Sequence, residues 1–150
     1  MITAQGMSEL AEGLRINTSL VELVLCDCEL GEEALLLLGE VLVENKTLET
    51  LHLVGNILDV AALSLFFEFV PKMKGLMKLS MINNAFCDES AGLAIVEGLL
   101  VNSSLQTIDQ IEGSELSFGV KESIHFYLQM NRNGRRFLQA PLSKSMPTGA

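Results

Sequence analysis

The chain has 150 residues, of which 49% are hydrophobic, and a formal net charge of −9. Its length fits one domain, and its longest apolar runs, such as ALLLLG at 34–39, are far too short to span a bilayer. Residues 1–117 contain 18 acidic and 5 basic residues. Residues 118–150 contain 1 acidic and 5 basic residues, so the totals are 19 acidic and 10 basic. An acidic body repels phosphate backbones, which argues against nucleic acid as a partner. The short apolar runs argue against a membrane. No signal sequence opens the chain, and we expect a cytoplasmic protein.

Three segments with helical apolar spacing superimpose on one another. They are LAEGLRINTSL at 10–20, LGEVLVENKTL at 38–48 and IVEGLLVNSSL at 95–105. Asn17, Asn45 and Asn102 close these segments, and asparagine tolerates the left-handed turn that ends many helices, so we expect that turn there. A fourth segment, LFFEFVPKMKGL at 65–76, lacks the asparagine and contains Pro71, which predicts a shorter helix. Asp59 and Asp88 stand where helix N-caps belong.

Strand-like segments follow the helical ones at a regular spacing. LVELVLCDCEL at 20–30, LETLHLVGNIL at 48–58, LMKLSMINNAF at 76–86 and LQTIDQIEG at 105–113 are separated by 28, 28 and 29 residues. They align in apolar columns, one of which is Leu23, Leu51, Leu79 and Ile108, and a further column holds Cys28, Asn56 and Asn84. Self-similarity at this period indicates a repeat architecture. We therefore expect strands near 20–25, 48–53, 76–81 and 105–110.

The aligned residues follow the pattern L-x-x-L-x-L-x-x-N/C-x-L, which resembles the leucine-rich repeat family. Over residues 8–113, the repeat length and the helical second half are similar to its ribonuclease-inhibitor-like class. The resemblance implies an α/β fold: a curved, right-handed solenoid of about four strand–helix repeats, with a parallel sheet on the concave side and helices on the convex side. It also implies that Asn56 and Asn84, and Cys28 at the same position, are structural. The asparagine amides would bond backbone groups of neighbouring repeats.

The ends of the repeat array differ from its middle. We expect leucine-rich repeats over residues 1–117, a C-terminal capping helix and turn over 118–138, and a disordered tail over 139–150. The segment SFGVKESIHFYLQMNRNGRRFL is amphipathic and is similar to terminal segments of some ribonuclease-inhibitor-like proteins. At the N-terminal end no cap is visible, and Leu10 and Leu14 need a partner. The chain could thus be a fragment of a longer array, or self-associate there.

A basic cluster, Arg132, Arg135 and Arg136, lies near the C-terminal end. It could bind a phosphate, or it could pair with the acidic body and with the carbonyl end of the last helix. Nucleic-acid sites usually add aromatic stacking residues, which this cluster lacks. We therefore favour a role in the cap.

In this architecture the strand residues that do not enter the core face the concave side. The predicted partner-binding residues are Glu22, Val24, Cys26, Thr50, His52, Val54, Lys78, Ser80, Ile82, Thr107, Asp109 and Ile111. One column across the face, Cys26, Val54, Ile82 and Ile111, is apolar throughout. Such a column could reflect only the preference of strands for β-branched residues. It could equally form an apolar strip in a protein-binding groove.

Catalysis and metal binding find little support in the residue pattern. His52, Ser80 and Asp109 are neighbours in one column, but a triad needs the Asp beside the His rather than beside the Ser. Cys26 and Cys28 form a lone C-x-C, whereas a zinc site needs about four ligands. We therefore predict no metal, no cofactor and a non-enzymatic protein–protein interaction module. The alternative is a structural terminal segment of a larger leucine-rich repeat protein, such as a NOD-like receptor or a GTPase-activating regulator.

Overall fold

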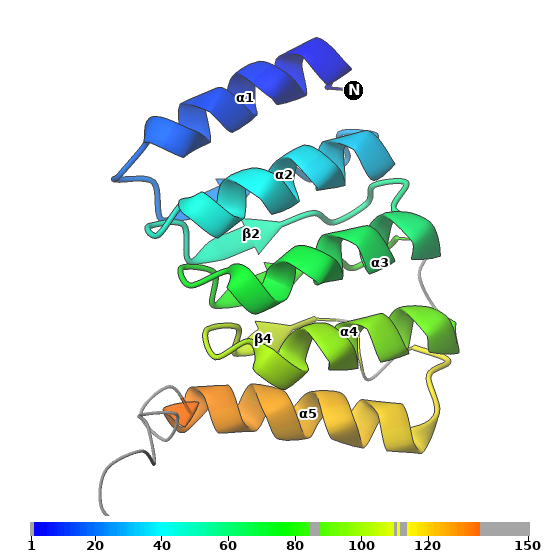
Figure 1. Ribbon diagram of the computed structural model, residues 1–150. Coiled ribbons are helices and arrows are strands. Elements are labelled where there is room, and N and C mark those ends of the chain that lie inside the picture. The colour runs from blue at the N-terminus through cyan, green and yellow to red at the C-terminus, as the bar shows by residue number, and fades with distance from the viewer. Residues whose placement is uncertain (1, 85–87, 110, 112–113, 136–150) are drawn as a thin grey trace, which may run out of the picture.

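The computed structural model describes residues 2–84, 88–109, 111 and 114–135. Within this part of the chain, helices and short strands alternate (Figure 1). In chain order the elements are α1 (Ala4–Ile16), β1 (Glu22–Val24), α2 (Glu32–Glu44), β2 (Thr50–His52), α3 (Val60–Phe69), the 3-10 helix η1 (Val70–Lys72), β3 (Lys78–Ser80), α4 (Glu89–Val101), β4 (Thr107–Ile108) and α5 (Phe118–Arg132). Each strand falls inside its predicted range but has only two or three residues, so the predicted strands were too long.

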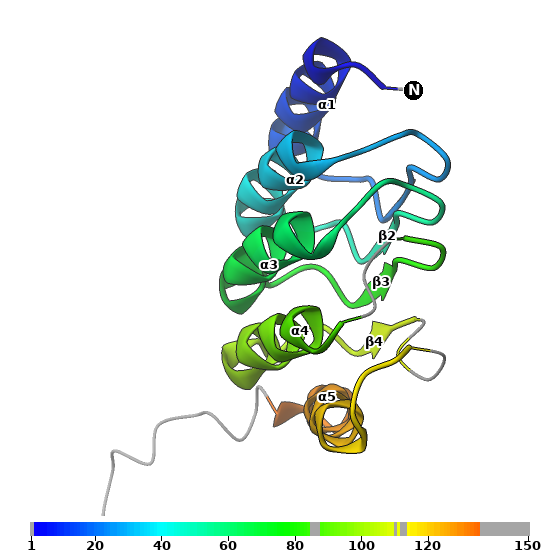
Figure 2. The same cartoon turned by 90° about the vertical axis from the view of Figure 1, so that its right-hand side faces the viewer.

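The four strands form one parallel sheet in the order β1-β2-β3-β4. Its register follows the repeat, since Leu23 pairs with Leu51, Leu51 with Leu79, and Leu79 with Ile108. Figure 2 shows α2, α3 and α4 stacked on one side of the strands, while α5 lies beside α4 at the end of the stack. The predicted parallel sheet with helices along one side is confirmed.

The unusual leucine spacing of residues 48–58 is explained by burial. Leu48, Leu51, Leu53 and Leu58 are at most 1% exposed, and all belong to one continuous hydrophobic core. Leu51 lies in the strand, Leu53 follows it directly, and Leu58 comes after the turn at Val54 and Gly55. Each fully buried leucine contributes roughly 1.5–3 kcal/mol. Burial of all four residues therefore favours a short strand followed by a bend.

Asn56 and Asn84 hold the turns after β2 and β3. The Asn56 amide donates to the carbonyls of Leu25 and Leu53, both at 2.8 Å, and its Oδ1 accepts from the N–H groups of Cys28 (3.1 Å) and Leu30 (3.0 Å). The Asn84 amide donates in the same way to Leu53 and Met81. These bonds satisfy backbone groups that a non-strand turn would leave unpaired. The predicted structural role of both asparagines is confirmed.

The asparagines that close the helices behave differently from the prediction. Asn17, Asn45 and Asn102 have φ angles of −76°, −70° and −65° and extended backbone, so the expected left-handed turn is wrong. Each side-chain Oδ1 instead accepts from the backbone N–H groups two and three residues further on. This local bond stabilises an extended exit from the helix, which a left-handed residue would not provide.

A left-handed backbone conformation recurs three residues after the end of β1, β2 and β3. Asp27, Gly55 and Asn83 have φ angles of 52°, 67° and 57°. Glycine adopts this conformation freely, and Asp and Asn tolerate it better than other residues do. At Gly55 a Cβ atom would also lie 2.0 Å from Oδ1 of Asp27. The three residue types therefore match the backbone that the turn requires.

Side chains cap the N-terminal ends of three successive helices at the same repeat position. Asp59 accepts from the N–H of Ala62 and Asp88 from that of Ala91, which confirms both predicted caps. Ser117 caps α5. The predicted shortening of the third helix is confirmed as well: α3 has ten residues, against thirteen in α2 and α4, and passes into η1, which contains Pro71. Proline lacks the N–H that an α-helix interior needs.

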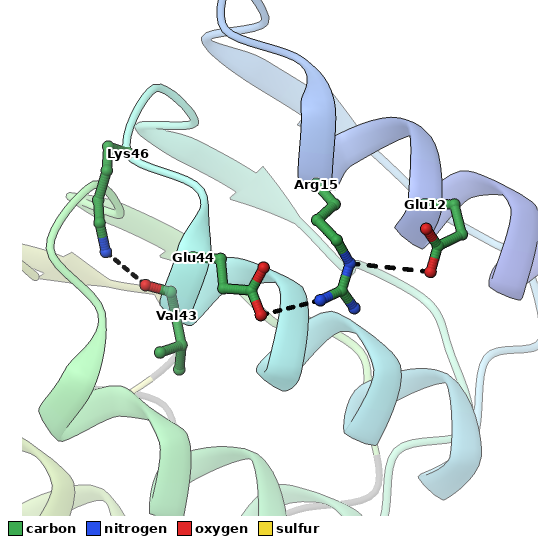
Figure 3. A network of polar contacts seen from close by, with 5 residues as sticks. All are labelled: Glu12, Arg15, Val43, Glu44 and Lys46. Carbon is green, nitrogen blue, oxygen red and sulfur yellow. Dashed lines mark hydrogen bonds and ion pairs between the residues drawn. The ribbon is translucent and has the colours of Figure 1, made fainter.

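The first helix is tied to the second by a surface ion pair (Figure 3). The Arg15 guanidinium donates to Oε1 of Glu44 at 2.8 Å and lies 3.7 Å from Oε1 of Glu12. Both acidic side chains are more than half exposed. Exposed pairs of this kind contribute at most about 1 kcal/mol. Packing of Met7, Ala11 and other apolar residues of α1 therefore dominates its attachment.

A carboxylate joins the first turn of α4 to the start of α5. Glu89 accepts from the Ser117 hydroxyl at 2.5 Å and from the Ser117 N–H at 2.9 Å, and these bonds lower the pKa of Glu89. A lowered folded-state pKa adds stability above the unfolded value, which is lost as the pH falls through the folded value. We therefore expect Glu89→Gln to lose less stability than the wild type during acidification from neutral pH.

The measurement is the free energy of unfolding by urea at a series of pH values from 7 to 3. Glu97→Gln is the matched control, because Glu97 is an exposed residue of the same helix and makes no ion pair within the described residues. An acid dependence identical in wild type and Glu89→Gln would contradict the role of this contact.

Candidate functional site: the strand face

The strand face comprises the side chains of β1–β4 and the adjoining residues that do not enter the leucine core. The pairing register places Glu22, Thr50, Lys78 and Thr107 in one row across the sheet. Val24, His52 and Ser80 form the next row. Cys26, Val54 and Ile82 continue the alignment, since the N–H of Asp27 donates to Val54 and that of Gly55 to Ile82. Neighbouring strands lie about 4.8 Å apart, so members of a row are close enough to share a ligand.

Apolar side chains are exposed on this face. Val24 is 59% exposed and Ile82 is 39% exposed, while Cys26 and Val54 are half-buried. Ile57, just beyond the face, is 65% exposed and was not among the predicted binding residues. The equivalent residue in the preceding repeat is Glu29, so an apolar residue at a polar repeat position was the available signal. The exposed apolar residues come from three successive repeats.

Two of the predicted face residues do not reach solvent. Ile111 is 2% exposed and belongs to the hydrophobic core, and Ser80 is 5% exposed. The expectation that both residues are exposed is wrong. Since β4 ends at Ile108, the strand geometry that would turn Ile111 outward no longer applies there. The apolar row is therefore exposed only as far as Ile82.

Polar side chains surround the apolar residues. His52 Nε2 lies 3.0 Å from Oε1 of Glu22, across β1 and β2. Lys78 is exposed, and Thr50, Thr107 and Asp109 are half-buried. His52 thus contacts a carboxylate rather than the Ser80 hydroxyl, although His52 and Ser80 are paired across β2 and β3. The face therefore offers both hydrogen-bond donors and hydrogen-bond acceptors around an apolar centre.

The arginines near the C-terminal end contact backbone carbonyls. Arg135 donates to the carbonyls of Leu99, Leu100 and Asn102 at the end of α4, and its guanidinium lies 5.2 Å from the Tyr127 ring centroid. Arg132 donates through Nε to the carbonyl of Gln106. Contact with a helix carbonyl end is confirmed for Arg135, although the helix is α4 rather than the last one. Arg136 lies outside the described residues, as does the predicted tail.

The helix side also exposes apolar residues. Leu93, Leu100 and Val101 of α4 are 50–56% exposed, and Phe118 and Phe126 of α5 are more so. A groove of 550 Å³ between α3 and α4 is lined by Phe67, Pro71, Leu93 and others. Apolar exposure alone therefore does not distinguish the strand face from the helix side, and the two must be compared experimentally.

The described part of the chain contains neither a metal-ligand cluster nor a helix that could cross a membrane. No group of three or more His, Cys, Asp or Glu residues lies close enough there to hold a metal ion. Cys28 Sγ instead donates to the carbonyl of Cys26. None of the helices described combines the length and the apolar composition that a bilayer crossing requires.

Comparison with known proteins places this architecture in the class of leucine-rich-repeat-like α/β folds. No family model and no curated protein matches the sequence. Among solved structures, the chain is similar to Leiomodin-1 Actin-Binding Site 2, with 20% identity over 92% of this chain and 79% of that chain and a TM-score of 0.78. It is also similar to the tropomodulin C-terminal domain of Caenorhabditis elegans, with 13% identity over 91% of this chain and 97% of that one and a TM-score of 0.56. At these identities the likeness establishes the fold.

These similarities correct one sequence-based conclusion. The similar structures are leiomodin and tropomodulin domains, so the assignment to the ribonuclease-inhibitor-like class was wrong. That assignment depended on a repeat of 28 or 29 residues with a helical second half. Both features occur in this chain, and a fold of this kind outside that class accommodates them equally well. Repeat length therefore indicates a strand–helix repeat unit but does not identify the ribonuclease-inhibitor-like class.

Proposed function

We propose that the chain is a non-enzymatic protein-interaction module that binds a protein partner on its strand face. The exposure of Val24 and Ile82 on a sheet surface carries this proposal, because strand residues that face only water are usually polar. His52, Glu22 and Lys78 supply the polar rim that protein interfaces typically have around an apolar centre. Neither similar structure is named as an enzyme, which supports a non-catalytic role.

We propose actin as the first partner to test. The support is the name of the leiomodin domain, an actin-binding site, together with its likeness in fold. We also propose that the repeats curve so that the strand face is concave, that α5 with residues up to 138 caps the repeats of residues 1–117, and that the protein acts in the cytoplasm. The alternative role, a structural segment of a larger protein, has no specific observation in its favour.

Val24→Asp/Ile82→Asp is the variant that tests the strand face. Both side chains are exposed, so folding should be preserved, while two carboxylates would disrupt an apolar contact. We expect actin affinity to fall at least about tenfold, which corresponds to about 1.4 kcal/mol. The measurement is co-sedimentation with filamentous actin and titration of monomeric actin, on proteins of equal melting temperature.

Leu93→Asp/Leu100→Asp is the matched control, since it adds the same charge at exposed apolar residues of α4. We expect its affinity to remain within about twofold of the wild type. Loss of binding in this control but not in the strand-face variant would move the site to the helices. If wild-type protein binds neither form of actin, actin is excluded as the partner.

A further inference from the structure

Basic residues of this acidic chain gather at one edge of the molecule. The loops that lead from the helices to β2, β3 and β4, together with the end of α5, enclose a pocket of 480 Å³. Lys46, Lys74 and Arg132 line this pocket, and its acidic lining residue is Glu49. Residues 1–117 contain only five basic residues, and two of them are in this pocket. We call it the loop-edge pocket.

The cations of the loop-edge pocket form no ion pair with any of the described residues. The three ion pairs within the described residues involve Arg15 and His52, and none involves a residue of this pocket. In the same part of the chain, Lys74 makes no hydrogen bond or ion pair, and Arg132 uses only its Nε, on Gln106. Lys46 donates to the carbonyl of Val43 (Figure 3), which leaves two of its three ammonium protons. The pocket therefore retains donors for an anionic ligand.

Such an arrangement is unfavourable without a ligand. Three positive charges around one pocket repel one another, and one carboxylate offsets only part of that repulsion. Carboxylates are abundant elsewhere in the chain, and Arg15 lies close to two of them, Glu12 and Glu44. The unpaired cations at the loop edge are thus a local feature rather than a result of scarce acidic residues. A carboxylate-bearing ligand would complement this charge.

A second feature of the pocket distinguishes a peptide from a simple anion. Asn131, which also lines the pocket, is 3% exposed, and its Oδ1 has no hydrogen-bond partner among the described residues. In Asn45 and Asn102 the same atom accepts two backbone N–H groups of the following loop. After Asn131 the N–H groups of Asn133 and Gly134 bond instead to the carbonyls of Gln129 and Asn131. An unsatisfied buried acceptor costs about 1–3 kcal/mol. Because this oxygen is closed to solvent, a peptide N–H satisfies it only by displacing the atoms that cover it.

We propose that the loop-edge pocket binds an acidic peptide segment of a protein partner. Its Asp or Glu carboxylates contact Lys46, Lys74 and Arg132, and one of its backbone N–H groups donates to Oδ1 of Asn131. Inorganic phosphate supplies anionic oxygens and one or two P–OH donors on a single small group. A peptide presents carboxylates and backbone N–H groups spaced along a chain, so it is the better complement to cations and an acceptor that lie apart. The proposal is independent of the strand face, which lies on different residues.

The experiment is a titration of isotope-labelled full chain followed by NMR at low salt. The probe is an acetylated and amidated peptide that alternates Glu and Gly over six residues, compared with its Gln counterpart. We expect saturable shifts at Ser103, Gln106 and the side-chain amide of Asn131 with the Glu peptide alone. Lys46→Gln/Lys74→Gln should weaken binding at least tenfold. Absence of saturable shifts in the wild type, or equal binding of the Gln peptide, would overturn the proposal.

Lys72→Gln/Lys121→Gln is the matched control, because it removes the same charge at lysines that line neither this pocket nor the strand face. We expect less than a twofold change, and equal weakening by both variants would reduce the interaction to general charge attraction and overturn the site. Two further ligands test whether the backbone N–H groups of the peptide contribute to binding. A Glu peptide with N-methylated backbone should bind several-fold more weakly, and inorganic phosphate more weakly still. If either binds as tightly as the parent peptide, recognition through Asn131 is wrong.

Discussion

Replacing Asn56 by alanine should lower the free energy of unfolding by about 3–5 kcal/mol. The side chain is 6% exposed and forms two donor and two acceptor bonds that connect the first two repeats. Its removal leaves the N–H groups of Cys28 and Leu30 and the carbonyls of Leu25 and Leu53 without these partners. Each buried group left unsatisfied costs about 1–3 kcal/mol, and water entering the vacated space offsets part of the sum. Urea unfolding followed by circular dichroism measures the change.

Two controls distinguish this network from a general sensitivity to asparagine loss. Asn17→Ala removes two acceptor bonds at an exposed helix end, where water can replace them, and should cost less than about 1 kcal/mol. Cys28→Ala changes the position equivalent to Asn56, but the Cys28 side chain makes a single hydrogen bond within the described residues, to the carbonyl of Cys26. A loss below about 1.5 kcal/mol is therefore expected. Equal losses in Asn56→Ala and Asn17→Ala would contradict the buried network.

The repeat made the sheet predictable because one spacing determines both the columns of aligned residues and the register of the strands. Aligning Leu23, Leu51 and Leu79 as a column also aligns them as neighbours in a parallel sheet, and the structure pairs these residues. The same alignment identified Asn56 and Asn84 as structural, since a polar residue that recurs inside an apolar pattern needs buried partners. Sequence alone was sufficient wherever a side chain has the same environment in every repeat.

Prediction failed where an environment changes from one repeat to the next. Ile111 occupies the column of Val54 and Ile82, but β4 ends at Ile108 and Ile111 turns into the core. The ribonuclease-inhibitor-like class was assigned from repeat length and the helical second half, which do not record how the repeats pack. At Asn17, Asn45 and Asn102 the residue type was compatible with two turns, and side-chain bonds to the following N–H groups selected the extended one. Alignment does not reveal such local competition.

Helix packing is a further property that the repeat pattern did not predict. Helix α3 carries larger side chains than its neighbours, and glycines face them from both sides. A Cβ atom on Gly39 of α2 would lie 2.4 Å from the Phe69 ring, and one on Gly98 of α4 would lie 2.9 Å from the backbone carbonyl oxygen of Phe67. The bulk of α3 is therefore accommodated by the absence of side chains at these two positions.

Because of this close packing, Gly98→Ala should destabilise the protein by about 1–3 kcal/mol, the usual effect of overpacking. The obstacle is backbone rather than the end of a flexible side chain, so α3 and α4 must separate. Ordinary helix propensity predicts the opposite sign, since alanine is favoured over glycine in a helix by up to about 1 kcal/mol. Thermal and urea unfolding of the variant decide between the two effects.

Gly13→Ala in α1 isolates the propensity effect, because nothing lies within 4 Å of the added Cβ atom. We expect this variant to be more stable than the wild type by up to about 1 kcal/mol. The same substitution should therefore change stability in opposite directions in two helices of one chain. Stabilisation of Gly98→Ala to the same extent would mean that α3 and α4 can separate freely. The contact between Gly98 and Phe67 would then not determine how the two helices pack.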